Sequence, residues 1–313
     1  MHKIIYNSKN KIRPIWRLLL FLVITFIINI PLQLALQEFL DSSLLRGVIS
    51  ASIYLISVVF SLFVQIKYLE KSSFKKYGLS INRIWIKEFF IGILISLIQL
   101  SLFFLLMYFS GNLKIVDYFT VYSSNYSFNY SFLAGLLSEI FGLIVGTSVE
   151  EIFFRAFLFY IAYEALRVLK KEPKKRALII LILIAPLFGI AHIFNEGATI
   201  ISTINLGVDA IIICLPFLIT GRLGMSIGMH FSWNLFLGAL FGFPISGNIA
   251  KVSVISINTP NNIFTGGVFG PEGSVLYILL VIIALLFILY WKKREHYDSF
   301  INPCILENDV SSH

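Results

Sequence analysis

The sequence predicts an all-α protein, a polytopic bundle of membrane-spanning helices. Its composition is the first reason: 58% of the 313 residues are hydrophobic, and the mean hydropathy is +0.85. Charged residues make up 13% of the chain, about half of their share in a soluble domain. The second reason is that apolar residues gather in stretches of about 20, the length of a helix that crosses a bilayer. The third is the one-sided distribution of basic residues between these stretches.

Eight stretches have the length and composition of a membrane-spanning helix. In chain order they are residues 18–35, 48–66, 89–108, 132–154, 178–193, 200–219, 225–243 and 275–290. Basic residues precede the first stretch, as they do in a signal peptide. That stretch is long for a signal peptide and no small-residue cleavage site follows it, so we expect a retained helix.

The basic residues test this count of helices. If the N-terminus is cytoplasmic and the helices alternate in direction, 21 of the 25 basic residues fall in cytoplasmic segments. Arg46, Lys114 and Lys251 fall outside, and Arg155 lies within an apolar stretch. Because cytoplasmic loops are rich in Lys and Arg, this split predicts about eight spans with both termini in the cytoplasm. The net charge of +8 therefore records orientation, and we expect no nucleic-acid partner.

The chain contains no internal repeat that would indicate a second domain. We divide it into helices one to three with their loops (1–131), a core of helices four to seven (132–243), and an outer loop, last helix and cytoplasmic tail (244–313). The outer loop contains the glycine-rich run 266–273. Cys214 lies in an apolar stretch and Cys304 in the polar tail, so we expect neither a disulfide nor a zinc module.

Several ionisable residues lie inside the apolar stretches, where each costs on the order of 3 kcal/mol. In the fourth stretch Glu151 and Arg155 are four residues apart and can pair on one helix face. An ion pair that only steadies the bundle would account for these two residues. It would not account for Glu150, which is turned away by about 100° and is left free for another partner. We therefore favour a functional role for this motif.

The fifth stretch contains His192. The seventh contains His230 and Asn234, which are four residues apart and project from one face of that helix. Hydrogen bonds between helices explain each of these residues equally well. Counted from the turn at Pro173, however, Glu151 and His192 lie at similar depth, within about 4.5 Å along the helix axes. His230 lies about 12 Å from the inner end of its helix. We therefore expect one site inside the membrane, toward the cytoplasmic side.

Two further acids, Glu139 and Asp209, lie in the fourth and sixth stretches. Glu139 is three helical turns from Glu150 on the same face, nearer the outside. We expect both acids to line the site without direct chemistry.

Carboxylates, imidazoles and a carboxamide in one place suit hydrolysis. Glu150 can take a proton from water and pass it to a leaving amine, while His230 and Asn234 donate hydrogen bonds to the developing oxyanion. Alternatively, a divalent metal such as zinc, with an open position for water, can be held by Glu150, His192 and His230. The sequence marks no Ser or Cys nucleophile, lacks the HExxH motif of common zinc proteases, and indicates no other cofactor.

Together the three motifs resemble those of the CPBP family (CAAX protease and bacteriocin-processing, also called Abi), which are multi-pass intramembrane proteases and include the type II CAAX prenyl endopeptidases. The motifs are Glu150-Glu151-x-x-x-Arg155, Phe188-x-x-x-His192 and His230-x-x-x-Asn234. The resemblance covers the core from about residue 132 to 243. The run 220–223 also resembles the family's run into its last motif, and the loop 266–273 resembles a loop of bacterial members.

The resemblance implies roles for these residues. Glu150 would activate the attacking water, and Glu151 and Arg155 would support it. The remaining motif residues would complete the site by polarising the substrate or by binding a metal; they are His192, His230 and Asn234.

The resemblance implies an intramembrane endopeptidase that cleaves a membrane-associated substrate, such as a prenylated peptide or a bacteriocin or pheromone precursor. Its expected partners are membrane lipid and a peptide or protein substrate. The alternative is a non-enzymatic immunity or scaffold protein of the same family. Intramembrane acids also mark transporters, but the sequence has no inverted repeat. Composition favours a multi-pass protein of the bacterial plasma membrane, and nothing indicates an oligomeric state.

Overall fold

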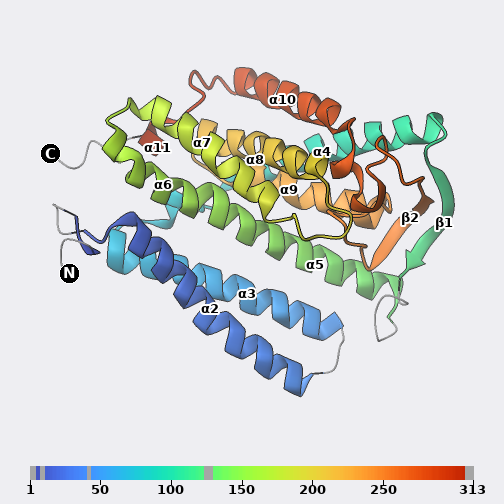
Figure 1. Ribbon diagram of the computed structural model, residues 1–313, viewed down its shortest axis with the longest axis horizontal. Coiled ribbons are helices and arrows are strands. Elements are labelled where there is room, and N and C mark those ends of the chain that lie inside the picture. Colours follow the sequence, from blue (N-terminus) through green and yellow to red (C-terminus); the bar gives the residue numbers. More distant parts are fainter. Residues whose placement is uncertain (1–4, 8–10, 41–43, 123–129, 307–313) are drawn as a thin grey trace.

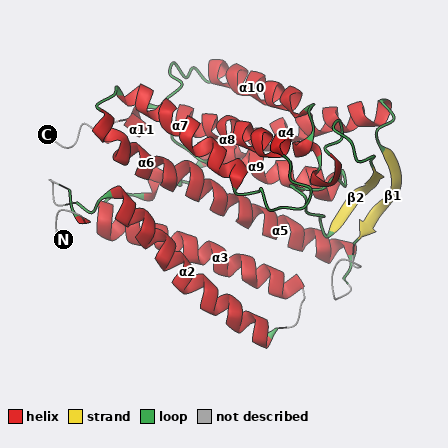
Figure 2. Ribbon diagram, viewed as in Figure 1, coloured by secondary structure: helices red, strands yellow, loops and turns green. Residues whose placement is uncertain are grey.

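The computed structural model describes residues 5–7, 11–40, 44–122 and 130–306, which form a helix bundle with a small sheet at one end (Figures 1 and 2). Each of the eight apolar stretches coincides with a helix. In chain order these helices are α2 (Pro14–Phe39), α3 (Leu44–Val64), α4 (Arg83–Phe109), α5 (Phe132–Glu151), α7 (Pro173–Ile190), α8 (Ile200–Thr220), α9 (Gly224–Leu235) and α10 (Tyr277–Arg294). The predicted helix bundle is therefore confirmed.

Five helices in the described part of the chain are long and apolar enough to cross a membrane. They are Pro14–Phe39, Leu44–Glu70, Arg83–Phe109, Phe132–Leu169 and Ile200–Thr220. The other three helices, α7, α9 and α10, are shorter. The chain is thus a multi-pass membrane protein, while the count of eight spans and the cytoplasmic termini stay predictions.

The longest helix runs past the predicted end of the fourth stretch. After α5 it continues through a π-helical segment, Ile152–Leu158, then through α6 (Phe159–Ala165) and a 3₁₀ turn, Leu166–Leu169. The π-helical segment begins directly after Glu151. Such segments inside α-helices are frequent at functional sites.

A two-stranded antiparallel sheet joins two long connections. β1 (Lys114–Val121) follows α4, and β2 (Val252–Asn258) follows α9. Lys114 lies opposite Asn258, and Val121 lies opposite Val252. The all-α prediction omitted this sheet, although both segments are rich in the β-branched residues that favour strands. Their position between apolar helices made them look like loops.

Because consecutive helices alternate in direction, the bundle has two ends (Figure 1). We call one the basic end; it carries residues 11–13, 65–82, 166–172, 221–223 and 295–306. We call the other the sheet end; it carries both strands and the connections 191–199 and 241–276. Of the basic residues predicted to be cytoplasmic, Lys3 and Lys9 lie outside the described residues and the rest lie at or near the basic end.

Buried ion pairs tie the helices together at the basic end. Arg17 of α2 pairs with Glu70 and, at 2.5 Å, with Glu164, while Lys76 lies 2.6 Å from Glu70. The carboxylate of Glu70 also accepts a hydrogen bond from the Tyr77 hydroxyl. These contacts join α2, the end of α3, the 3₁₀ turn Phe74–Tyr77 and α6.

A second ion pair joins α4 to the turn before α9. The guanidinium of Arg222 donates to both carboxylate oxygens of Glu88, at 2.8 and 2.5 Å, and to the hydroxyl of Tyr297. The chain then returns to α8, where the Asn302 side chain donates to the Thr220 carbonyl and Ile305 is fully buried. Part of the polar C-terminal segment is thus fixed to the bundle.

A close contact between α4 and α9 fixes the helix that carries the third motif. A Cβ atom at Gly228 would lie only 2.1 Å from the Phe89 carbonyl oxygen, so only glycine allows this approach. Ser96 of α4 also donates a hydrogen bond to the Met229 carbonyl. With one face of α9 held against α4, the polar side chains of the motif point toward α5 and α7.

Candidate active site

Four of the six predicted site residues line one cavity of about 290 Å³, while Glu151 and Arg155 lie outside it. It lies between α5, α7, α8 and α9 and is bounded by connections of the sheet end. The motif residues that line it are Glu150, Phe188, His192, His230 and Asn234. The structure therefore brings together side chains that are up to 84 positions apart in the chain, from Glu150 to Asn234.

Glu150 faces the cavity from the middle of the long helix. Its side chain is 37% exposed, and its Oε2 atom lies 3.8 Å from Nε2 of His230. This distance is too long for a direct hydrogen bond. Oε2 of Glu150 has no hydrogen-bond partner in the protein, as expected of an acid that acts on an incoming group.

Glu151 does not line the cavity, and it contacts the ring nitrogen of His230 that is remote from Glu150. Nδ1 of His230 lies 2.8 Å from Oε1 of Glu151. Since a carboxylate only accepts, Nδ1 carries the hydrogen and donates it, and Nε2 of His230 faces Glu150. Glu151 is fully buried, and its negative charge is balanced by Arg155, whose Nη1 lies 3.1 Å from the same oxygen.

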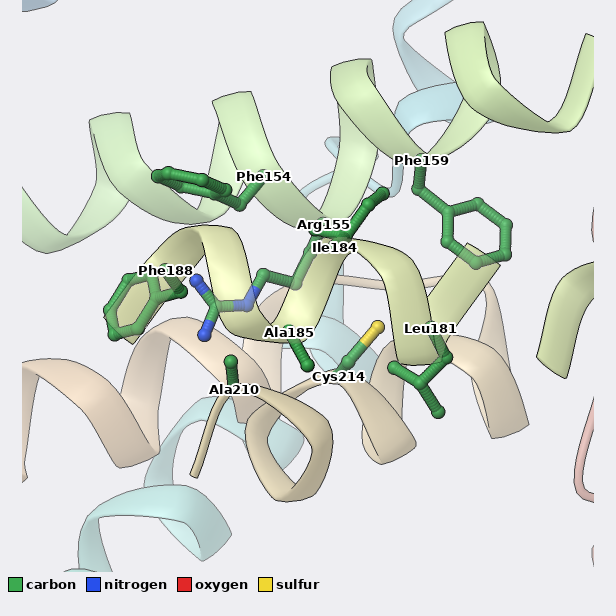
Figure 3. A pocket seen from close by; sticks show the side chains of 9 residues that line it. All are labelled: Phe154, Arg155, Phe159, Leu181, Ile184, Ala185, Phe188, Ala210 and Cys214. Atoms are coloured by element: carbon green, nitrogen blue, oxygen red, sulfur yellow. The ribbon is translucent and has the colours of Figure 1, made fainter. Parts of the chain in front are cut away.

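Arg155 also connects the first motif to the second. Figure 3 shows its side chain extending toward Phe188 and Ala210. The guanidinium carbon lies 4.4 Å from the centre of the Phe188 ring, within the range of a cation–π contact. The space around it, which Cys214 also lines, has a volume of only about 10 Å³. Arg155 is 2% exposed, so it positions other residues and does not reach the cavity.

His192 lies in a turn that follows α7. The predicted fifth stretch extended to residue 193, but the helix ends at Ile190, and turn hydrogen bonds such as His192 N–H to the Gly189 carbonyl replace the helical pattern. Nδ1 of His192 lies 2.8 Å from the Phe188 carbonyl oxygen, which can only accept. Nδ1 therefore carries the hydrogen, and Nε2 is left available to the cavity.

The expected position of the site toward the cytoplasmic side of the membrane stays a prediction. The carboxylates and His192 do lie at similar depth, but the cavity extends from them toward the sheet end, where Asn195, Ser246 and Asn248 line it. The prediction treated His192 as part of a helix. The end of α7 at Ile190 places His192 beside the connections of the sheet end instead.

The two additional acids line the cavity as expected. Glu139 lies 2.9 Å from the ammonium of Lys251 and so attaches the start of β2 to α5. Asp209 of α8 lies near the side chain of Tyr277. Both acids lie among the lining residues.

Sequence reasoning missed Glu272, a buried acid that forms one wall of the cavity. Its Oε1 accepts a hydrogen bond from the Trp233 indole at 2.9 Å, and its Oε2 accepts from the backbone N–H and the hydroxyl of Ser246, each at 2.7 Å. The glycine-rich loop folds back to place it: Gly270 has a φ of 92°, which favours glycine. In the sequence, the available sign of a functional role for Glu272 was that it is the only acidic residue in the glycine-rich run 266–273.

The described residues do not form a three-ligand metal site. No group of three or more His, Cys, Asp or Glu side chains in the described part of the chain is placed to hold a metal ion. His192 and His230 each have Nδ1 bound to an oxygen, as histidines of metal sites do, but Glu150 and the two Nε2 atoms do not converge. We therefore derive no chemical step through a metal.

Comparison with known proteins gives one match. The family model described as type II CAAX prenyl endopeptidase Rce1-like matches residues 132–236, about a third of the chain. No curated protein and no solved structure matches the chain. The matched segment contains all three motifs and the four helices that surround the cavity. Residues 132–236 are thus similar to the type II CAAX prenyl endopeptidase Rce1-like family, which supports the resemblance to CAAX (CPBP) proteases that the motifs predicted.

Proposed function

We propose that the protein is an intramembrane endopeptidase that hydrolyses a peptide bond with a water activated by Glu150. One observation carries the proposal: a single cavity holds a carboxylate without a hydrogen-bond partner, two imidazoles and a carboxamide, contributed by three separate motifs. The family match, which names endopeptidases, supports the same reaction class.

Proton transfer is assigned to Glu150. A water that donates to Oε2 of Glu150 fits beside Nε2 of His230, because 3.8 Å allows one water to contact both atoms at about 2.8 Å. Glu150 takes the proton as the water oxygen bonds to the carbonyl carbon. It then gives the proton to the leaving nitrogen as the C–N bond breaks.

The developing oxyanion needs hydrogen-bond donors. His230 lies between the carboxylates of Glu150 and Glu151, and these two negative charges favour its imidazolium form. In that form Nε2–H of His230 and the side-chain amide of Asn234 donate to the oxyanion. Glu151 and Arg155 act as positioning residues, since they fix the orientation of His230 without facing the cavity.

The test compares wild type with Glu150→Gln in purified, reconstituted protein. The assay uses a set of fluorogenic peptides that includes a farnesylated peptide, its unmodified counterpart and a membrane-inserted peptide. We expect Glu150→Gln to lower cleavage by about 10²–10⁴-fold, the usual contribution of a general base. Because Oε2 of Glu150 makes no hydrogen bond in the protein, the unfolding temperature should not change.

Glu196→Gln is the matched control, since Glu196 is an exposed acid at the sheet end that does not line the cavity. It should keep wild-type activity. Undiminished cleavage by Glu150→Gln would sink the proposed mechanism. A protein that cleaves no peptide in the set, but gives a cellular phenotype that survives Glu150→Gln, would favour the immunity or scaffold role.

A further inference from the structure

A second cavity lies at the basic end of the bundle, and the proposed reaction does not account for it. Its volume is about 380 Å³. Three segments that are distant in the chain form most of its lining: residues 73–82 before α4, residues 220–222 between α8 and α9, and residues 302–305 near the C-terminus. Among the described residues, none lines both this cavity and the catalytic one. We call it the basic cavity.

The lining of the basic cavity contains cations and no acid. Lys75, Lys76 and Arg222 belong to it, and none of the described residues that line it is Asp or Glu. Lys76 pairs with Glu70 and Arg222 pairs with Glu88, but both carboxylates lie outside the lining, with side chains 5% and 3% exposed. The catalytic cavity is the reverse, with four carboxyl groups and no Lys or Arg in its described lining. The basic cavity therefore attracts an anion.

Arg222 is held in place by Glu88 and keeps one nitrogen for a ligand. Its Nε and Nη2 atoms donate to the two carboxylate oxygens of Glu88, and Nη2 also donates to the Tyr297 hydroxyl. No acceptor within the described residues binds the remaining nitrogen, Nη1, and 22% of the side chain is exposed. Guanidinium groups form strong charge-assisted hydrogen bonds with phosphate, and one that is already fixed loses little freedom on binding.

Four other side chains of the lining have donors without an acceptor in the described part of the chain. Lys75 is exposed and forms no ion pair there, and the hydroxyls of Ser73 and Ser80 make no hydrogen bond there. Oδ1 of Asn82 accepts from two backbone N–H groups at the start of α4, at 3.0 Å each, which leaves its Nδ2 as a donor. A lining rich in such donors suits a phosphate group, which offers several strong acceptor oxygens.

The basic cavity lies at the depth of one bilayer surface. Asn82 is the residue directly before α4, and Thr220 is the last residue of α8; both helices are long and apolar enough to cross a membrane. Exposed apolar side chains lie beside the lining, since Ile81 is 68% exposed and Ile84 in the first turn of α4 is 53% exposed. A polar cavity at the ends of two spans is placed where the phosphate groups of lipids lie.

We infer that the basic cavity is a phosphate-binding site, in which Lys75, Asn82 and Arg222 donate to the oxygens of the ligand. Phosphate reaches a membrane surface in two forms, as the headgroup of an anionic lipid and as a soluble phosphate, and these donors recognise the group that both forms share. A bound phosphate joins the segment before α4 to the turn before α9, so it should also stabilise the bundle. The inference does not depend on peptide cleavage.

Cys304 provides a reporter that needs no substitution. It is an exposed free thiol that lines the basic cavity, whereas Cys214 is buried. The purified full chain in a neutral detergent is treated with uncharged N-ethylmaleimide, in inorganic phosphate or in chloride of the same ionic strength, so that charge screening is equal. Phosphate at about ten times its dissociation constant should slow the reaction of Cys304 about tenfold, because only the empty protein reacts.

The double variant Lys75→Gln, Asn82→Asp tests the assignment of the site. Asp caps a helix as well as Asn does, so the start of α4 is preserved, while a negative oxygen that repels phosphate replaces the amide donor. Phosphate should no longer protect Cys304 in this variant. The matched control is Lys171→Gln, Lys174→Gln, which lowers the net charge by the same amount at exposed residues that do not line the cavity. It should keep wild-type protection.

A second measurement separates the two sources of phosphate. The unfolding temperatures of the same proteins are compared in mixed micelles that contain phosphatidic acid or phosphatidylcholine. A rise of a few degrees with phosphatidic acid, lost only in the Lys75→Gln, Asn82→Asp variant, would identify a lipid headgroup as the ligand. Protection of Cys304 by inorganic phosphate without this rise would identify a soluble phosphate. Equal effects in the wild type and this variant, or neither effect in the wild type, would overturn the inference.

Discussion

The two ends of the bundle use charged residues in different ways. At the basic end each buried carboxylate faces a cation: Glu70 meets Arg17 and Lys76, and Glu88 meets Arg222. At the sheet end Glu139 pairs with Lys251 and Glu272 accepts hydrogen bonds from neutral groups, while the cavity contains a carboxylate oxygen, on Glu150, without a hydrogen-bond partner. Paired charges stabilise a bundle, whereas a charge that faces a cavity without a partner is available for chemistry.

The largest expected effect on stability lies at the basic end. Arg222→Ala leaves the Glu88 side chain, which is 3% exposed, without its cation. Breaking a buried pair costs about 3–5 kcal/mol, and thermal unfolding in detergent should show it. Hydrogen bonding to Glu88 raises the pKa of Arg222, so a rise in pH does not break the pair and substitution is the appropriate test. The double variant Arg222→Met, Glu88→Leu should regain most of the lost stability.

In the active site, removing a charged partner should lower activity more than stability. Glu151→Gln keeps an oxygen for His230 but removes the charge that favours its imidazolium form. Loss of a supporting partner of this kind usually costs about 10–100-fold. We expect the loss in kcat, with KM unchanged, because Glu151 does not face the cavity. An equal loss through KM would mean that Glu151 shapes the substrate path instead.

A smaller effect is expected from the wall of the cavity. Glu272→Gln cannot accept from both the Trp233 indole and the Ser246 N–H and hydroxyl, because one of its two terminal atoms becomes a donor. An unpaired buried donor costs about 1–3 kcal/mol. We expect a lower unfolding temperature and a raised KM, with kcat nearly unchanged. A wild-type unfolding temperature would show that Glu272 does not hold the loop.

The smallest effect concerns Lys76 at the basic end. Burial and, to a smaller extent, the nearby Arg17 lower the pKa of Lys76 to about 8. The unfolded chain then binds more protons than the folded protein between pH 8 and about 10.4, so this residue destabilises the fold below pH 8 and stability rises through that window. Lys76→Met should raise the unfolding temperature at pH 7 by a few degrees and flatten this pH dependence. A lower unfolding temperature at pH 7 would show that its pairing with Glu70 outweighs the cost of burial.

Most of the fold and the main site residues were predictable from the sequence because their signals are local. An apolar stretch identifies its own helix, and Glu150, Glu151 and Arg155 stand out in lipid because charge there is costly. Their pairing followed from helical periodicity alone. The small sheet and Glu272 were missed, because their partners lie far along the chain: β2 pairs with a strand more than 130 residues earlier.

The sequence by itself determined the helices, the gathering of basic residues at one end and the three motifs that identify the family. Only the tertiary structure decided which way the site extends. That depends on where α7 ends, on the loop that places Glu272 against Trp233, and on the hydrogen bond by which Glu151 holds His230. The last two are contacts between segments that are distant in the chain, and the cavity is the space that such contacts leave.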